Sequence, residues 1–242
     1  VGIVVLWVIL TLTGQWRQVT RRSISTHVVR NAAHFTGQNL WFYAMTSIPL
    51  AQVFALEFTS PIWVVLLSPL ILGEPLTRLR LMSVLAGFVG ILIVARPSPD
   101  TISPGLIAAA SSAVFFVLSV MYTRLLTRTE TVLCIMFWLT LMQAAFGIIF
   151  SAWDGDMVAP SAQTLPWLVL IGLAGLLAHY CLTSALAIAP ATVVVPIDFV
   201  RLPTIAIVGM LLYGEALDAW VFVGATVIFA ANYANIWYAN RR

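Results

Sequence analysis

The fold is decided by a stretch of 33 residues that occurs twice in the chain. Residues 44–76 read AMTSIPLAQVFALEFTSPIWVVLLSPLILGEPL, and residues 185–217 read ALAIAPATVVVPIDFVRLPTIAIVGMLLYGEAL. The two copies align without a gap at an offset of 141 residues and share 8 identical positions. Each copy carries one acid within an otherwise apolar helix, Glu57 in the first and Asp198 in the second. A duplicated apolar segment with a matched acid in each copy predicts a transporter built from two related halves.

The composition around these copies is that of a membrane protein. Hydrophobic residues make up 61% and charged residues 9% of the 242 residues, and the mean hydropathy is +1.00. Apolar runs near the length needed to cross a bilayer recur along the whole chain. They are too long and continuous for the alternating segments of a barrel. The predicted class is therefore all-α, a polytopic helical membrane protein.

Nine apolar segments are expected, with proline and glycine at their joints. They cover 1–14, 27–45, 50–72, 79–96, 104–124, 130–151, 167–188, 191–213 and 217–238. The turn at 97–104 divides the chain into a first repeat, 1–98, and a second repeat, 99–242.

The basic residues predict the orientation of the segments. All 12 are arginine; nine lie in one set of alternate loops, and Arg96 is alone in the other set. The arginine-rich side, and with it the C-terminus, is expected to face the cytoplasm. The membrane is expected to be the inner membrane of the cell. Segments 50–72 and 191–213 then cross in opposite directions, so the repeats are inverted. The net charge of +3 is spread over loops, which argues against a nucleic-acid partner.

Inversion also sets the expected number of helices. Segments 104–124 and 130–151 need two counterparts before residue 15, where one short run is present. We expect one further span, and part of another, to precede Val1. The expected fold has ten helices, of which about nine are present.

These features resemble the EamA-type transporters of the drug/metabolite transporter superfamily. The resemblance is carried by the pairs Gly73-Glu74 and Gly214-Glu215, and by the patterns AMTSIPLA at 44–51 and ALAIAPAT at 185–192. It covers the whole chain and implies ten helices in two five-helix repeats. Its short motifs indicate fold and mechanism and leave the substrate open.

The charged residues inside the segments are the main candidates for function, because a charge at bilayer depth needs a partner or a use. Glu57 and Asp198 are expected to straddle the midplane, roughly 10 Å apart along the normal. Arg201, three residues after Asp198, is expected to pair with Asp198 and to reach toward Glu57 or an anionic substrate. An unpaired Glu57 would suit proton coupling. The alternative is that Arg30, His34 or Arg201 satisfies Glu57, which then only joins helices.

A polar stripe along segment 27–45 supplies further candidates. Arg30, His34, Gln38 and Trp41 follow one another at steps of four, four and three residues, so they share a helical face. His179 of the second repeat aligns with Gln38, which places the two histidines at different levels. Each histidine is as well explained by packing as by binding. Trp41 and Tyr180 could stack on a planar substrate or a cation.

Two prolines interrupt the central segments. Pro61 and Pro203 remove the hydrogen bonds that would use the carbonyls of Glu57 and Phe199. We expect an ordinary kink at each proline rather than a gate.

The sequence thus predicts an alternating-access carrier of a small metabolite with an anionic or zwitterionic group, such as an amino acid or organic anion. A planar flavin-like or nucleoside-like solute is compatible with the aromatic residues. The expected substrate-binding residues are Glu57, Asp198, Arg201, His34, Gln38, Trp41, His179 and Tyr180. Protons are the candidate coupling ion, the protein is expected as a monomer or homodimer in the lipid bilayer, and no cofactor or metal is expected. The alternatives are a non-transporting membrane sensor or structural subunit, and a membrane-integral enzyme.

Overall fold

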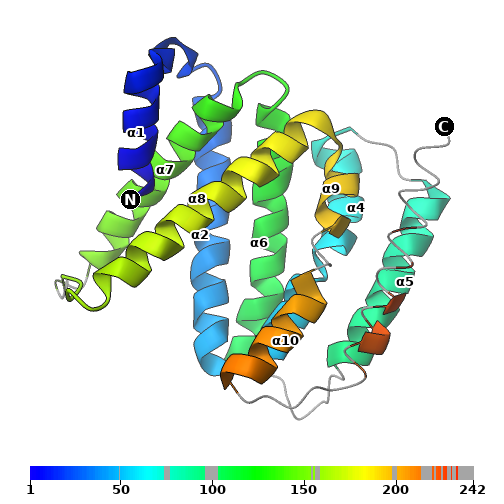
Figure 1. Ribbon diagram of the computed structural model, residues 1–242. Coiled ribbons are helices and arrows are strands. Elements are labelled where there is room, and N and C mark those ends of the chain that lie inside the picture. The colour runs from blue at the N-terminus through cyan, green and yellow to red at the C-terminus, as the bar shows by residue number, and fades with distance from the viewer. Residues whose placement is uncertain are drawn as a thin grey trace. The chain divides into compact units, whose positions relative to one another are not determined.

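The regular structure of the described residues is entirely helical (Figure 1). The computed structural model describes residues 1–48, 50–73, 77–95, 103–153, 155, 159–197, 201–213 and eight positions between 220 and 233. The helices are α1 (Gly2–Thr13), the 3-10 turn η1 (Gln15–Gln18), α2 (Ile24–Ser47), α3 (Leu50–Glu57), α4 (Ser60–Ile71), α5 (Arg78–Ala95), α6 (Pro104–Leu126), α7 (Val132–Ser151), α8 (Leu165–Ile188), α9 (Ala191–Ile197) and α10 (Arg201–Tyr213). The all-α prediction is confirmed. Eight of the nine expected segments coincide with these helices, and the ninth, 217–238, lies mostly outside the described residues.

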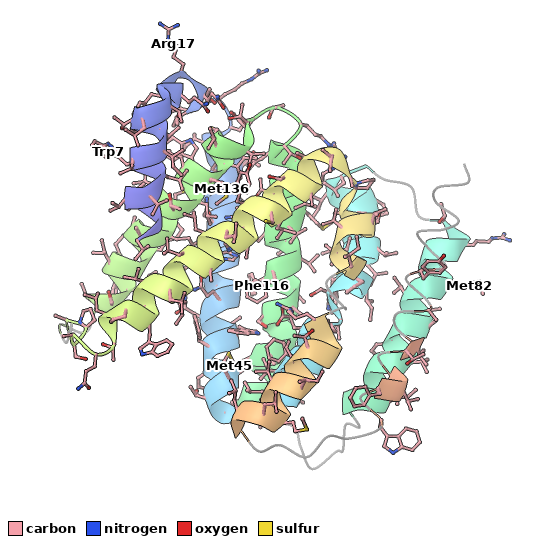
Figure 2. The ribbon with its side chains drawn as sticks, viewed as in Figure 1. Trp7, Arg17, Met45, Met82, Phe116 and Met136 are labelled. Carbon is pink, nitrogen blue, oxygen red and sulfur yellow. The ribbon has the colours of Figure 1, made fainter. Side chains whose placement is uncertain are left out.

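Three of the described helices are long and apolar enough to cross a membrane by length and composition. They are α6, α7 and α8. Two shorter apolar helices, α1 and α4, accompany them. Apolar side chains face outward along these helices, as Trp7 of α1 does at 56% exposure (Figure 2). Outward apolar side chains are expected where the surroundings are lipid.

The first copy of the repeat is broken where a kink was expected. The chain leaves α3 at Glu57 and enters α4 at Ser60, with a turn at Phe58 and Thr59 between them. Pro61 lies in the first turn of α4, where its missing N–H leaves no hydrogen bond unmade. The proline therefore starts a new helix, and segment 50–72 is two helices. In the second copy α9 ends at Ile197 and α10 begins at Arg201, and the residues between them lie outside the described part.

The described chain divides into two compact units, each with a core of its own. The first comprises residues 1–35 and 122–190, with α1, α7, α8 and the beginning of α2. In it α1 packs along α7 (Figure 1), and the buried side chains of Leu6, Met136 and Leu139 form the core between them. Arg124, near the end of α6, donates a hydrogen bond to the carbonyl of Leu186 in the last turn of α8. A cation at that end of a helix offsets the negative end of its dipole.

The second unit comprises residues 36–121 and 191–242. Its core holds the buried residues Ala44, Val53, Ala108 and Ala109, and so joins α2, α3 and α6. Small residues let these helices approach closely. At Gly105, for example, an added Cβ would lie 2.7 Å from the Cβ of Ser47. This close packing fixes the end of α2 relative to α3. Both helices carry polar side chains that meet in this unit, Trp41 on α2 and Glu57 on α3.

Candidate functional site

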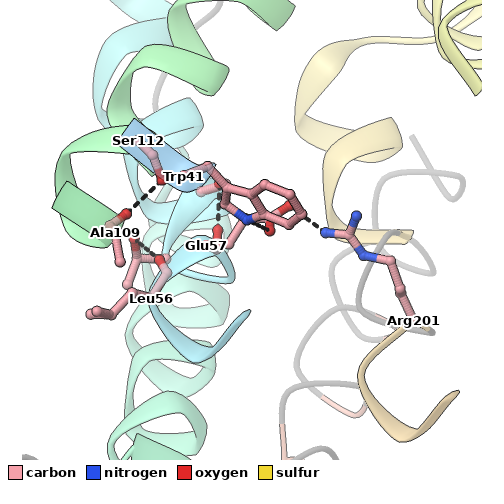
Figure 3. Close-up of polar contacts among 8 residues, drawn as sticks. Trp41, Leu56, Glu57, Ala109, Ser112 and Arg201 are labelled. Carbon is pink, nitrogen blue, oxygen red and sulfur yellow. Dashed lines mark hydrogen bonds and ion pairs between the residues drawn. The ribbon is translucent and has the colours of Figure 1, made fainter. Parts of the chain in front are cut away.

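An ion pair lies at the helix break of the second unit. The carboxylate of Glu57, at the end of α3, accepts a hydrogen bond from the guanidinium of Arg201, at the start of α10 (Figure 3). The side chains are 14% and 38% exposed, respectively, so the acid is the more enclosed partner. Burial strengthens the attraction because less water screens it, and it makes the loss of either partner costly.

Trp41 of α2 holds the other oxygen of the same carboxylate. Its Nε1 donates a hydrogen bond to Oε2 of Glu57 at 2.9 Å, while Arg201 binds Oε1 (Figure 3). The indole also packs edge-to-face on Phe54, with the ring centroids 5.9 Å apart. Trp41 therefore orients the acid as well as enclosing it.

Two phenylalanines complete the surroundings of the guanidinium. Its central carbon lies 5.5 Å from the ring centroid of Phe54 and 5.7 Å from that of Phe58. Cations are attracted to aromatic faces at this range. Phe54 was not among the residues expected from the sequence. Its place one turn before Glu57 was the available signal, since residues three apart on a helix share a face.

The broken helix leaves a backbone carbonyl beside the ion pair. The hydroxyl of Ser60 donates a hydrogen bond to the carbonyl of Glu57, and that of Thr59 donates to the carbonyl of Leu56 at 2.7 Å. These bonds replace part of what the break between α3 and α4 removes from the helical ladder. The backbone groups at the break are thus satisfied locally, without drawing on the carboxylate of Glu57.

The sequence-based expectations for this cluster are met in part. Glu57 is paired, so the version of the proton-coupling hypothesis that required an unpaired acid does not describe this structure. Arg201 reaches Glu57, as one of the alternatives held. Its expected pairing with Asp198 stays a prediction, because Asp198 lies outside the described residues. Gln38, one turn before Trp41 on α2, is half-buried.

The two histidines meet in the first unit. The rings of His34 on α2 and His179 on α8 pack edge-to-face with centroids 4.7 Å apart. The expected difference in level along the repeats does not keep them apart, because aligned positions ignore how two helices cross. Tyr180, the neighbour of His179, is 50% exposed. Arg30, one turn before His34, is only 2% exposed.

Apolar helices that enclose an ion pair, a buried arginine and a histidine pair define a polytopic membrane protein of the transporter class. The family model described as the EamA-like transporter family matches residues 1–96 and 103–237. The chain belongs to the EamA-like transporter family. It is a membrane transporter of small molecules and not an enzyme, in keeping with the transporter names of its curated relatives.

Two relatives and one solved structure show the breadth of the likeness. A riboflavin transporter of Brucella anthropi is 34% identical over 211 residues, which cover 85% of this chain and 74% of that protein. An S-adenosylmethionine uptake transporter of Rickettsia prowazekii is 24% identical over 207 residues, which cover 85% and 69%. A crystal structure that is 19% identical aligns with a TM-score of 0.78 over 100% of this chain and 85% of the other. That structure shows the fold alone.

Proposed function

We propose that the chain is an alternating-access carrier of a flat heteroaromatic metabolite of the flavin class. The observation that carries the proposal is the cluster of Trp41, Phe54 and Phe58 around the Glu57–Arg201 pair. Aromatic side chains offer faces on which a flat ring system can stack. The carboxylate accepts and the guanidinium donates hydrogen bonds, which matches an imide edge where an N–H lies between two carbonyls. The riboflavin transporter among the relatives supports this substrate class.

A zwitterionic metabolite is the second candidate, and the ion pair itself favours it. A molecule with both charges could take over Glu57 with its cation and Arg201 with its anion, so that no charge is left unpaired. The S-adenosylmethionine transporter among the relatives supports this alternative. A purely anionic substrate is less well supported, because Arg201 already has a carboxylate partner.

Protons are proposed as the coupling ion. A substrate that draws Arg201 away leaves the carboxylate of Glu57, which is 14% exposed, in need of another positive charge. A proton from water can supply it without a further binding site. The cycle then alternates between a paired and a protonated Glu57, and the two inverted repeats, 1–98 and 99–242, are proposed to move against each other around it.

The surroundings of the carrier are proposed on the same basis. Arginine asymmetry favours the inner membrane with a cytoplasmic C-terminus, and the chain is proposed to act as a monomer or homodimer. A reporter fused to the C-terminus tests the orientation. If the fusion is active only with a reporter that works in the periplasm, the C-terminus is not cytoplasmic and the proposed topology is wrong.

Uptake into vesicles tests the substrate. Proteoliposomes holding the full chain are expected to accumulate labelled riboflavin saturably, and excess unlabelled flavin should compete while an amino-acid mixture should not. Trp41→Ala should abolish uptake, whereas Trp63→Ala, an aromatic residue of α4 that is 36% exposed, should leave it near the wild-type level. Uptake of S-adenosylmethionine with none of riboflavin would favour the second candidate, and uptake no greater than in empty vesicles for both would overturn the carrier assignment.

A further inference from the structure

Arg30 is a buried cation with neutral partners. Its side chain is 2% exposed; Nε donates to Oγ1 of Thr123 at 3.0 Å, and Nη1 donates to Oδ1 of Asn31 at 2.8 Å. The amide of Asn31 is itself fixed, because its Nδ2 donates to the carbonyl of His27 at 2.8 Å. A guanidinium has five N–H donors, and the hydrogen bonds among the described residues occupy two of them. The site therefore has donors in reserve for an acceptor.

The helices around Arg30 supply no counter-charge. The sequences of α1, α2, α6, α7 and α8 contain neither aspartate nor glutamate. Among the described residues of this unit, the acidic residue is Glu130, which lies between α6 and α7. Its carboxylate accepts a hydrogen bond from the hydroxyl of Thr20 at 2.7 Å. Asp154 and Asp156 lie outside the described residues. A buried charge without a counter-ion is strongly unfavourable, so this arrangement favours the arrival of an anion.

A pair of imidazoles lies within electrostatic reach of the same cation. His34 lies one turn beyond Arg30 on α2, and His179 of α8 packs against it with ring centroids 4.7 Å apart. Both rings are within electrostatic reach of Arg30. Both are half-buried, whereas Arg30 is buried, so the imidazoles are more accessible than the guanidinium.

We infer that Arg30, His34 and His179 form a binding site for a small monovalent anion, which is taken up together with a proton. The shared chemistry is that of a halide or a carboxylate, and the source is either an inorganic anion or an acidic group of a substrate. The site does not depend on which metabolite is carried; only its use in coupling rests on the proposed carrier function.

The proton follows from Coulomb's law. A positive charge on either imidazole is opposed first by burial and then by repulsion from Arg30, and the charge of a bound anion offsets both. One imidazole of the pair can then be protonated and donate a hydrogen bond to the anion. The other titratable or charged groups in this unit's helices and the α6–α7 connection are His27, Tyr122, Arg124, Arg128, Glu130, Cys134, Tyr180 and Cys181. Of these, His27 is also within electrostatic reach of Arg30, but its ring is fully buried and interacts with Glu130, so the half-buried His34–His179 pair is the proposed site of proton uptake.

Replacement of the anion in the buffer tests the site in the full chain, purified in lipid nanodiscs. Sodium gluconate, whose anion is too large for the proposed site, is exchanged for sodium chloride or sodium acetate at constant ionic strength. Either small anion is expected to raise Tm by about 3 °C at ten times its dissociation constant, and more at pH 6 than at pH 8. Stabilisation by chloride identifies an inorganic anion, and stabilisation by acetate alone identifies a carboxylate group. The absence of any shift with both overturns the inference.

Two variants assign the effect to these residues. Arg30→Gln should lose the anion-dependent shift, whereas Arg17→Gln should keep it, because Arg17 extends outward from η1 (Figure 2). An unchanged shift in Arg30→Gln overturns the site. Where Arg30→Gln does not fold, the double variant His34→Gln and His179→Gln is used with a pH-sensitive dye in weak buffer. It should lose proton uptake on addition of the anion, and undiminished uptake overturns the coupling of anion and proton.

Discussion

The carboxylate of Glu57 and the guanidinium of Arg201 join the two copies of the duplicated segment. They stand 144 residues apart in the chain and meet where α3 ends and α10 begins. The first copy has Ser60 at the position that aligns with Arg201, so the repeat supplies one base for its two acids. The aligned residues of the opposite copies, Asp198 and Ser60, cannot form an equivalent ion pair, and the duplicated fold is asymmetric at this contact.

A double-mutant cycle on this pair is expected to show strong coupling. Glu57→Gln and Arg201→Gln each leave one enclosed charge without its partner, whereas the double variant leaves none. We expect a coupling energy of about 1.5 kcal/mol, with the 38% exposure of Arg201 limiting it through solvent screening. Substrate affinity should fall roughly tenfold in each single variant. Tm and vesicle uptake measure the two effects, and Arg78→Gln, an exposed arginine of α5, is the matched control.

Additive effects of the two substitutions on Tm would show that the pair contributes no mutual stabilisation. If the two substitutions affect Tm additively but each still lowers uptake, the pair serves transport and not stability.

Trp41→Phe separates hydrogen bonding from stacking. The phenyl ring keeps an aromatic face near Phe54 but loses the N–H that binds Oε2 of Glu57 at 2.9 Å. A hydrogen bond to a charged group is worth about 1.5–3 kcal/mol, so KM should rise roughly tenfold or more. Trp41→Ala should lose further affinity because it removes the face as well. Equal KM values for Trp41→Phe and the wild type would exclude a role for the indole N–H.

Ser60→Ala tests the local satisfaction of the helix break. The substitution removes the hydroxyl that donates to the carbonyl of Glu57, where the helical ladder is interrupted. We expect a loss of about 1 kcal/mol in the free energy of unfolding. Ser47→Ala is the control, because the hydroxyl of Ser47 also donates to a carbonyl, that of Tyr43 at 2.8 Å, but at an exposed position within α2. Denaturation of both variants should show the larger loss for Ser60→Ala, and a larger loss for Ser47→Ala would show that the break does not need this hydroxyl.

Local sequence signals were enough to find the helices and the charged residues. Apolar runs and their proline and glycine joints define the segments because length and hydrophobicity decide which stretches can span lipid. The duplicated acid marked Glu57 in the same way. Pro61 signalled an interruption as well, but a proline near a helix start and one within a kinked helix have the same local pattern. The full break between Glu57 and Ser60 therefore required the structure.

The partners of these residues depended on tertiary packing. Spacing predicts contacts within one helix, such as Arg201 with Asp198 three residues earlier, and gives no preference among residues more than a hundred positions away. The contact of His34 with His179 and that of Phe54 with Arg201 both depend on how separate helices pack. Glu130 gave no signal at all in the sequence, because a lone acid in a short connection is ordinary.

Stability in acid should depend on Glu130, which lies outside the membrane-spanning helices. Burial raises the pKa of its carboxyl, but hydrogen bonding from Thr20, Ser23 and Cys134 and the nearby His27 together lower that pKa below its ordinary value. A carboxyl whose pKa is lower in the folded state binds more protons when unfolded. It therefore contributes stability above its ordinary pKa of about 4.3, and that contribution is lost as pH falls through the folded value.

Glu130→Gln should accordingly flatten the fall in Tm between about pH 5 and pH 3, with the ordinary pKa of the group near the middle of that window. Thr20→Ala should flatten it in part, because it removes the hydroxyl that donates to Oε2 at 2.7 Å and leaves the other contacts in place. Thr13→Ala is the control, since the hydroxyl of Thr13 is exposed and donates to the carbonyl of Ile9 within its own helix. If Tm falls equally steeply with decreasing pH in Glu130→Gln and in the wild type, other carboxylates dominate acid unfolding. If Glu130→Gln reduces this acid-dependent fall in Tm but Thr20→Ala does not, the effect belongs to the other contacts of the carboxylate, with Ser23, Cys134 and His27.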